Sequence, residues 1–219
     1  DVAQRVVDVV LGALSKAIPE RVVAASNGAT TGVYFLGHKH DGSYYAYIET
    51  LGGGMGASLY GDGADGVQVH TTNTSNLPVE ALELEYPILV ERYELVEDSG
   101  GPGENRGGLG ILRQYRILSD ETKIRTKGDR NVLSPWGLKG GMPGGRSRAI
   151  RNVSTKHQEN LNIKESALVL HTDETLSIIT PGAGGYGDPK KRDQGKVRLD
   201  AKEGKISKQS ALRDYGIKL

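Results

Sequence analysis

The chain has 219 residues, of which 37% are hydrophobic and 25% are charged, proportions typical of a folded globular domain. The formal net charge is only +1, so the overall charge gives no reason to expect nucleic acid as a partner. The sequence contains no cysteine, which excludes disulfides, thiolate nucleophiles and cysteine-ligated zinc, and no apolar run approaches the ~20 residues that span a membrane.

The first predicted element is an amphipathic helix over residues 3–18. Apolar side chains recur there at spacings of three and four: Ala3, Val6, Val7, Val10, Leu11, Leu14 and Ile18. Pro19 ends the pattern because proline cannot continue a helix.

Several hairpins are predicted after this helix. The segments TGVYFLGH (31–38) and SYYAYIET (43–50) are rich in β-branched and aromatic residues, and Asp41-Gly42 lies between them. Two further hairpins are predicted where strand-like runs follow each other closely: 109–118 with 121–128, joined at Ser119-Asp120, and 167–172 with 174–180.

Between the first two hairpins, a short helix is predicted over 77–87 and a strand over 88–96. Pro78 suits the first turn of this helix, and Pro87 stops it. Strands therefore outnumber helices along the chain. The predicted fold class is α+β: a β-rich antiparallel body with an N-terminal amphipathic helix, a short C-terminal helix and glycine-rich loops.

The sequence divides into a compact region of residues 1–189 and a basic tail of residues 190–219. From Asp188 onward, ten Lys or Arg residues stand against five Asp or Glu residues, a pattern usual for a solvated helix surface. Ser207 is a suitable N-cap for the last short helix.

Glycine is the compositional outlier, with 31 residues in clusters that show no fixed period. The densest cluster is DSGGPGENRGGLG (98–110), which contains Asp98 and Arg106. Three interpretations remain open: a phosphate cradle, a substrate-facing loop, or a tight turn held by the two charged residues. The segment lacks the lysine of a GxxxxGK[ST] phosphate loop, and a strand rather than a helix follows it.

Two other pairs are candidate site residues. Asp129 and Arg130 place a carboxylate beside a guanidinium before a second glycine-rich loop, where they could contact a ligand or form an internal ion pair. Asn73 and Asn76 lie in the amide- and hydroxyl-rich stretch HTTNTSN, where they could orient a polar substrate or hold a turn.

The histidines give little reason to expect a metal or a catalytic triad. His38 and His40 would share one face of a strand, but they lie at a predicted hairpin turn without a clear third ligand. No histidine has a serine or acidic partner at a recognisable spacing. We therefore expect no metal site in this chain.

Nine motifs occur together and in order along the chain. They are VVDVVLGALSKAIPERVVAASNG (6–28), ETLGGGMGA (49–57), GDGADG (61–66), TNTSNLPVEALELEYPILVERYEL (72–95), DSGGPGENRGGLGILRQYRI (98–117), GDR (128–130), PWGLKGG (135–141), TPGAGGYGDP (180–189) and GKISKQSALRDYGI (204–217). Together they resemble the hydantoinase B/5-oxoprolinase family, which also includes large subunits of acetone and acetophenone carboxylases. The resemblance covers nearly the whole chain and corresponds to the C-terminal part of the family's B-type subunit.

The resemblance implies a type of chemistry and a set of partners. Similar proteins work with a hydantoinase A-like subunit that binds ATP, and the carbonyl oxygen of a cyclic amide or ketone is activated by phosphorylation. A divalent metal then supplies a nucleophilic hydroxide. Because the family's metal ligands belong to the N-terminal half of the B-type subunit, we expect ATP and metal to be bound by other chains. One of these chains would carry that missing half.

Three functions follow as expectations. The first is part of the B-type subunit of an ATP-dependent cyclic amide hydrolase that opens hydantoin, 5-oxoproline or lactam rings and is active only in a complex. The second is a subunit of an ATP-dependent ketone carboxylase, and the third is a non-catalytic structural subunit. All three imply a cytoplasmic complex acting on a small molecule, with no nucleic acid or membrane partner. The candidate substrate- or interface-loop residues are Asp98, Arg106, Asp129, Arg130, Asn73 and Asn76.

Overall fold

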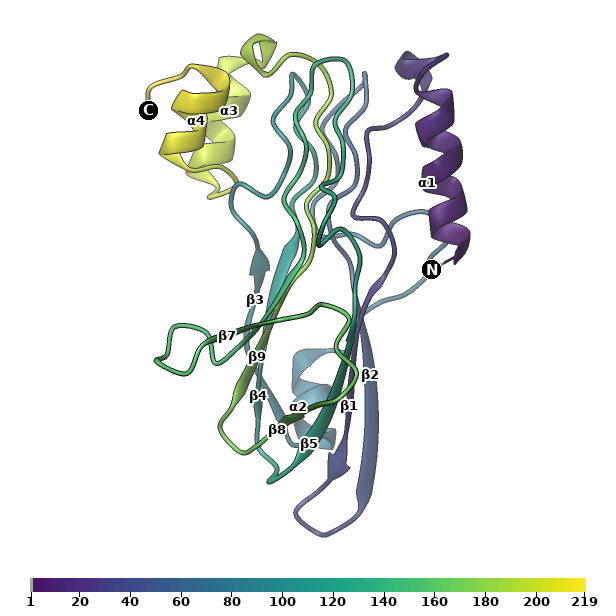
Figure 1. Ribbon diagram of the computed structural model, residues 1–219. Helices are drawn as coiled ribbons and strands as arrows, with labels where there is room; N and C mark the ends of the chain where they lie inside the picture. Colours follow the sequence, from purple (N-terminus) through teal and green to yellow (C-terminus); the bar gives the residue numbers. More distant parts are fainter. Residues whose placement is uncertain (1) are drawn as a thin grey trace.

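The computed structural model describes residues 2–219 as two antiparallel β-sheets with helices around them (Figure 1). The first sheet has the order β2-β1-β5-β8 and consists of β1 (Thr31–His38), β2 (Tyr44–Leu51), β5 (Thr122–Lys127) and β8 (Leu168–Leu170). The second has the order β3-β4-β9-β6-β7 and consists of β3 (Ile88–Leu95), β4 (Ile111–Ile117), β6 (Arg148–Arg151), β7 (Glu159–Leu161) and β9 (Thr175–Ile179). The helices are α1 (Val2–Leu14), α2 (Val79–Glu85), α3 (Gln194–Lys202) and α4 (Lys208–Tyr215). The α+β fold class is confirmed.

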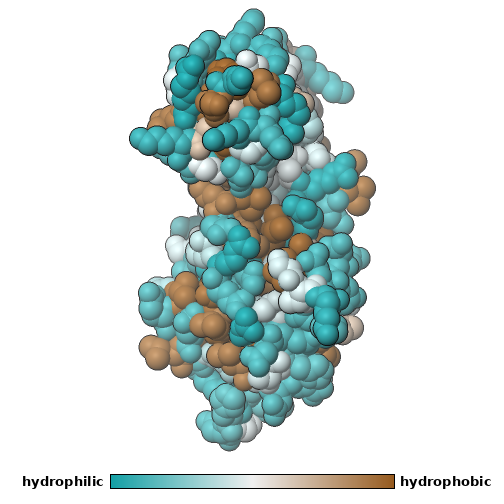
Figure 2. Space-filling model, turned by 90° about the vertical axis from the view of Figure 1, so that its left-hand side faces the viewer, coloured by the Kyte–Doolittle hydropathy of each residue, from teal (hydrophilic) through white to brown (hydrophobic). Residues whose placement is uncertain are grey.

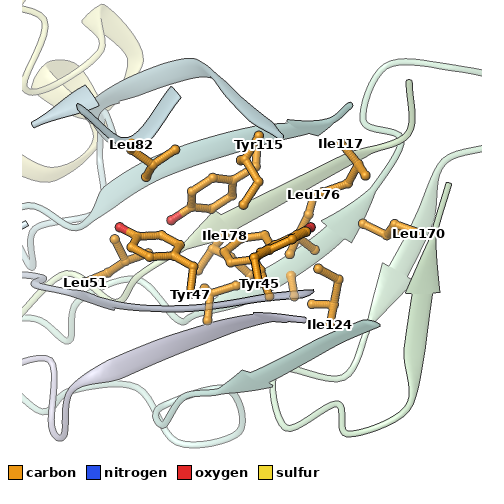
Figure 3. Close-up of a cluster of buried hydrophobic side chains, with 14 of the residues drawn as sticks. Tyr45, Tyr47, Leu51, Leu82, Tyr115, Ile117, Ile124, Leu170, Leu176 and Ile178 are labelled. Atoms are coloured by element: carbon orange, nitrogen blue, oxygen red, sulfur yellow. The ribbon is translucent and has the colours of Figure 1, made fainter. Parts of the chain in front are cut away.

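The two sheets pack face to face over one hydrophobic core (Figure 3). Phe35 of β1 meets Tyr115 of β4 edge to face, with ring centroids 5.0 Å apart. Leu82 of α2 is fully buried in the same core. Alternating side chains of β2 and β5 face the space between the sheets, as expected of a β-sandwich.

The hairpin predicted over 31–50 is confirmed, because β1 and β2 pair in register from Thr31 opposite Leu51 to His38 opposite Tyr44. The other two predicted hairpins are wrong. Strands β4 and β5 belong to different sheets, and so do β8 and β9.

The connection between β4 and β5 passes from one sheet to the other, so the two strands do not pair as a hairpin. The Ser119 hydroxyl lies 2.7 Å from that of Thr122, which lies 2.8 Å from the Tyr45 hydroxyl. These three buried groups satisfy one another at the end of the sandwich. A short connection of this kind has the same sequence pattern as a hairpin, so strand propensity alone cannot separate them.

The glycine-rich segments form a second body, which we call the glycine bundle. It consists of residues 24–28, 52–57, 61–67, 99–110, 135–145 and 180–187, which run side by side in extended form above the sandwich (Figure 1). The last of these segments lies among four others. Gly184 N–H donates to Ala25 O at 2.8 Å, Ala183 N–H to Gly108 O at 2.9 Å and Gly185 N–H to Met142 O at 3.0 Å, while Pro181 O accepts from Gly54 N–H at 3.0 Å.

Four hydrogen-bonded neighbours distinguish this bundle from a sheet, in which a strand has at most two. The backbones can approach so closely only because side chains are missing at the contacts. A Cβ placed on Gly182 would lie 1.8 Å from Ser99 O, and one on Gly56 would lie 1.8 Å from Ala24 O. The glycine clusters are therefore a packing requirement of the bundle.

Helices flank the glycine bundle on both sides, with α1 on one side and α3 and α4 on the other (Figure 1). Helix α3 is absent from the sequence-based expectation, although Asp193 caps it by accepting a hydrogen bond from Lys196 N–H at 3.0 Å. The predicted cap of α4 is confirmed, since the Ser207 hydroxyl oxygen accepts from Ser210 N–H. A small separate core joins α3 and α4 through Val197, Ile206, Ala211 and Tyr215.

The face that carries α3 and α4 is largely hydrophilic, with a band of hydrophobic residues between these helices and the sandwich (Figure 2). Strand β3 carries exposed Leu89 and Leu95. Within residues 2–219, no helix has both the length and the apolar character needed to cross a membrane.

The glycine bundle gives a direct stability prediction. The substitution Gly182→Ala places a methyl group against the Ser99 carbonyl, so we expect the free energy of unfolding to fall by about 3 kcal/mol or more, or no folded protein to remain. Gly61→Ala is the matched control, because a Cβ there meets nothing within 4 Å. Urea unfolding followed by circular dichroism measures both. Equal stability of the two variants would contradict close backbone packing as the role of these glycines.

Candidate functional site

The six candidate residues lie in three separate places and do not form one site. Arg106 and Asp98 face the C-terminal helices, and Asp129 and Arg130 contact α1. Asn76 lies beside β2. Asn73 is exposed.

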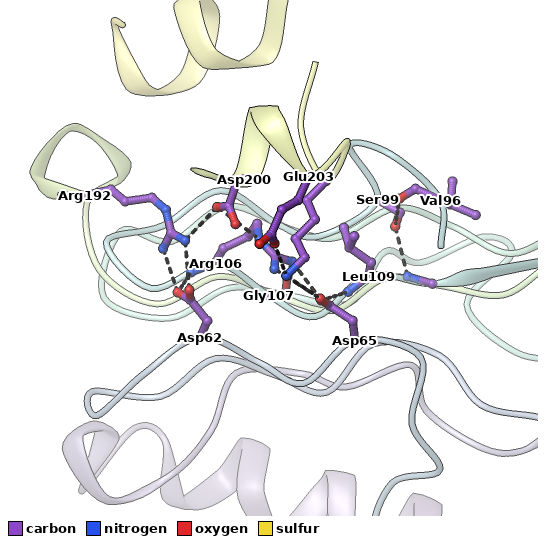
Figure 4. A network of polar contacts seen from close by, with 12 residues as sticks. Asp62, Asp65, Val96, Ser99, Arg106, Gly107, Leu109, Arg192, Asp200 and Glu203 are labelled. Atoms are coloured by element: carbon purple, nitrogen blue, oxygen red, sulfur yellow. Dashed lines mark hydrogen bonds and ion pairs between the residues drawn. The ribbon is translucent and has the colours of Figure 1, made fainter. Parts of the chain in front are cut away.

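Arg106 belongs to a network that we call the C-terminal clamp, formed by Asp62, Asp65, Arg106, Arg192 and Asp200 (Figure 4). Arg106 Nη1 donates to Asp65 Oδ1 at 3.0 Å and to the Gly107 carbonyl at 2.7 Å. Arg192 donates to both oxygens of Asp62, at 2.6 and 2.8 Å, and to Asp200 Oδ2 at 2.7 Å. The clamp thus joins the GDGADG motif, the 98–110 segment and α3.

The electrostatics of the C-terminal clamp follow from partial burial of paired charges. Burial raises the pKa of Asp62, but the hydrogen bonds and charge of Arg192 outweigh it and hold the pKa below 3.8. Asp65 behaves in the same way, with Arg106 as the opposing charge, so its pKa is also lowered. Both carboxylates are therefore ionised at neutral pH and occupied by in-chain partners.

Asp98 holds the start of α4 against the glycine bundle. Its backbone has a positive φ of 60°, its N–H donates to Lys205 O at 3.0 Å, and its carboxylate accepts from Ser207 N–H at 2.8 Å. A groove of about 300 Å³ lies beside it, lined in part by Met142 and Tyr215.

The 98–110 segment is now explained as a structural element of the bundle. Gly101 N–H donates to Ala183 O, Gly107 N–H to Gly101 O and Gly108 N–H to Met55 O. These donors would have to face a ligand in a phosphate cradle. These bonds favour the structural interpretation of the segment, and Arg106 fixes it through the C-terminal clamp.

Asp129 and Arg130 form part of a second network, the α1 anchor, with Arg5, Asp8 and His70. Arg5 Nη2 lies 2.6 Å from Asp129 Oδ2. Arg130 Nη2 donates to Asp8 Oδ2 at 2.9 Å, and His70 Nε2 lies 3.1 Å from Asp8 Oδ1. Burial raises the pKa of Asp129, but Arg5 outweighs this effect and lowers it below 3.8. The two residues therefore bind α1 to the body of the protein.

Asn76 leads to a buried network that the sequence analysis did not identify. Its side-chain amide donates to Glu49 Oε1 at 3.0 Å and to Thr50 O at 2.9 Å. Arg113 Nε donates to Glu49 Oε2 at 3.0 Å, and the Tyr115 hydroxyl donates to the same oxygen. Glu49 and Arg113 are 2% and 0% exposed, so the pair sits inside the sandwich.

A sequence signal for Glu49 existed, because it continues the core-facing alternation of Tyr45 and Tyr47 in β2. A groove of about 440 Å³ runs over this strand and presents side chains of Thr50, Thr74, Ser75 and Asn76. Hydroxyls and an amide suit an uncharged polar ligand. The Asn76 side chain itself is bonded within the chain, because its Oδ1 also accepts from the Tyr93 hydroxyl at 3.2 Å.

Across residues 2–219, no group of three or more His, Asp or Glu side chains is arranged to hold a metal ion. His38 and His40 line a small surface hollow near Asp120 and Glu121 without forming such a group.

Comparison with known proteins finds a family profile and several relatives that match most of this chain. The sequence profile described as hydantoinase B/oxoprolinase matches residues 1–189. The uncharacterized protein MJ0963 of Methanocaldococcus jannaschii is 42% identical over 221 residues, covering 100% of this chain and 38% of that protein. The 5-oxoprolinase 1 of Arabidopsis thaliana is 36% identical over 185 residues, covering 84% of this chain and 14% of that protein.

Solved structures show the same fold. The crystal structure of the ATP-dependent caprolactamase from Pseudomonas jessenii matches with a TM-score of 0.81 and 27% identity, over 94% of this chain and 37% of that chain. A nucleotide-free acetone carboxylase matches with a TM-score of 0.75 and 18% identity, over 93% of this chain and 31% of that chain, which shows a shared fold only. The chain spans less than two fifths of each of these four proteins.

The C-terminal clamp predicts a pH-dependent stability. Arg192→Met leaves the buried Asp200 without its closest partner, and removal of one member of a buried pair costs about 3–5 kcal/mol. Because the folded pKa of Asp62 is lowered, its contribution is present above the unfolded value of about 3.9 and is lost as the pH falls through the folded pKa. Wild-type stability should therefore fall below about pH 4, and the variant should show a shallower fall.

Urea unfolding between pH 7 and pH 2.5 measures both effects. Arg198→Met, at an exposed arginine of α3, is the control and should match the wild type. A loss below about 1 kcal/mol for Arg192→Met at pH 7, or an unchanged acid profile, would show that the clamp contributes no more than a surface pair.

Proposed function

The chain belongs to the hydantoinase B/oxoprolinase family, and on that premise we propose that it is part of the B-type subunit of an ATP-dependent cyclic amide hydrolase. The observation that carries the proposal is the match over residues 1–189, together with relatives named 5-oxoprolinase and caprolactamase. Hydantoin, 5-oxoproline and caprolactam share an amide bond within a ring, so this bond defines the substrate class.

The reaction class explains why ATP is required. A neutral amide is a poor electrophile because its nitrogen donates electron density to the carbonyl carbon. Transfer of the ATP γ-phosphoryl group to the carbonyl oxygen releases ADP and gives an O-phosphorylated amide whose carbon is a better electrophile. Water then adds to this carbon, the C–N bond breaks with the ring nitrogen leaving as an amine, and the resulting acyl phosphate is hydrolysed to a carboxylate and inorganic phosphate. We place the phosphorylation on a hydantoinase A-like subunit, within a cytoplasmic complex.

The contribution of this chain is structural support of the complex and presentation of its surfaces. Asp98, Arg106, Asp129 and Arg130 all bond to partners within the chain, which supports a positioning role for each of them. We assign the ATP and divalent metal sites to other polypeptides of the complex, including the one that completes the B-type subunit. The residues described here offer no suitable metal-ligating group, and no step of the reaction is assigned to them through a metal.

Ketone carboxylation receives no separate support from the structure. Acetone carboxylase shares the fold at 18% identity, and a shared fold does not determine which carbonyl is activated. The cyclic amide proposal is preferred because two more similar relatives carry names that state a cyclic amide substrate. They are the 5-oxoprolinase, at 36% identity, and the caprolactamase, at 27% identity.

ATP turnover in the complete complex tests the proposed activity. We expect ADP release to rise at least about tenfold with hydantoin, 5-oxoproline or a lactam, with no requirement for bicarbonate. The matched comparison is acetone or acetophenone with bicarbonate. Stimulation only by a ketone with bicarbonate would identify a carboxylase, and no stimulation by any ring would contradict the proposal.

A further inference from the structure

We propose that the outward face of α1 is the surface on which the remaining polypeptide of the B-type subunit docks. This inference rests on the proposed function, because the docking partner is another part of the same proposed enzyme. The occupant is the portion of the longer relatives that this chain does not span.

Helix α1 exposes a stripe of apolar residues to solvent, on the side that faces away from the rest of the chain. The apolar stripe consists of Val2, Val6, Val9, Val10 and Leu14, whose exposed fractions are 80%, 57%, 70%, 49% and 39%. These positions fall on one arc of a helical wheel at 100° per residue. An amphipathic helix normally turns such an arc toward a core, so here the core that receives it lies outside the chain.

The inner face of α1 is held to the body of the protein by polar contacts. Gln4, the one buried residue of the helix, donates to Val69 O at 3.2 Å and accepts from Thr30 N–H at 3.1 Å. Arg5 and Asp8 make the ion pairs of the α1 anchor. Hydrogen bonds and ion pairs fix the rotation of the helix about its axis, so the outward direction of the apolar stripe is built into the fold.

A neighbouring loop adds apolar residues beside the same helix. Val132 and Leu133 are 67% and 74% exposed. Their loop begins after Arg130, which bonds to Asp8, and reaches Trp136, whose ring lies 3.5 Å from a Cβ placed on Gly12. The exposed apolar surface on this side therefore comes from two elements, which is typical of an interface between polypeptides.

The length of the relatives identifies the occupant. This chain covers 38% of MJ0963 and 37% of the caprolactamase chain. The larger part of those proteins must therefore pack on some surface of the matched part, and α1 presents five outward apolar side chains on one arc. A membrane surface is a poorer occupant, because helices that bind lipid headgroups are rich in Lys and Arg on the polar face. The charged residues of α1, Arg5 and Asp8, are both bonded inward.

A binding experiment tests this surface without any enzyme assay. The probe is the part of MJ0963 outside the 221 matched residues, produced as a separate polypeptide and titrated into this chain by isothermal calorimetry. We expect a one-to-one complex. The double variant Val6→Glu/Val10→Glu should bind at least about 100-fold more weakly, because charged side chains would be buried at the interface. Circular dichroism checks that the helix is retained.

The matched control is Leu84→Glu/Leu199→Glu, at apolar residues of α2 and α3 that are 89% and 51% exposed. It should bind like the wild type. No binding by the wild type, equal binding by the α1 variant, or self-association of this chain that requires Val6 and Val10 would each overturn the proposal. Binding needs neither ATP nor substrate, so its failure is distinguishable from the failure of the proposed activity.

Discussion

The backbone hydrogen bonds of residues 180–187 hold the upper half of the molecule together. This segment bonds to four others, and each approach is close enough that a single methyl group would collide with a carbonyl. Four neighbours around one extended segment leave no room for a conventional side-chain core. The bundle therefore obtains its order from satisfied peptide groups, and glycine at the contacts is the condition for it.

Charged residues attach the helices to this bundle. The C-terminal clamp joins Arg106 and Asp65 to Asp200 of α3, and the α1 anchor joins Asp129 and Arg130 to α1 on the other side. Paired charges suit this task because their geometry is directional, whereas apolar contacts would not fix a helix in one rotation. The result is a glycine bundle with a defined helix face on each side.

The sequence predicted structure well where an element depends only on residues that are close together along the chain. The helix predicted over residues 3–18 and the Asp41-Gly42 turn both depend on neighbours in sequence. The hairpin is confirmed, and the helix is present but ends at Leu14 rather than at Ile18. The hairpins predicted around Ser119-Asp120 and within 167–180 are wrong, because a short connection can cross between two sheets as easily as it can reverse in one.

The candidate site was harder to predict, because a charge in a glycine-rich loop looks the same whether it binds a ligand or a distant loop. Arg106 is paired with residues 41 and 94 positions away along the chain, distances at which sequence spacing carries no information. Glu49 shows the opposite case. The alternation of β2 placed it toward the core, so a buried partner could have been expected, but the identity of Arg113 required the sheet register.

Native-state amide hydrogen exchange is the most direct measurement of whether the glycine bundle is a cooperative part of the fold. The amides of Gly54, Gly101, Gly108 and Ala183–Gly185 donate to neighbouring segments, so they should exchange as slowly as the amides of Phe35 and Tyr115 in the sandwich. Equal protection, governed by global unfolding, is the predicted result. Exchange of the bundle amides about 100-fold faster than the sandwich amides would contradict a hydrogen-bonded bundle and leave these segments as ordinary surface loops.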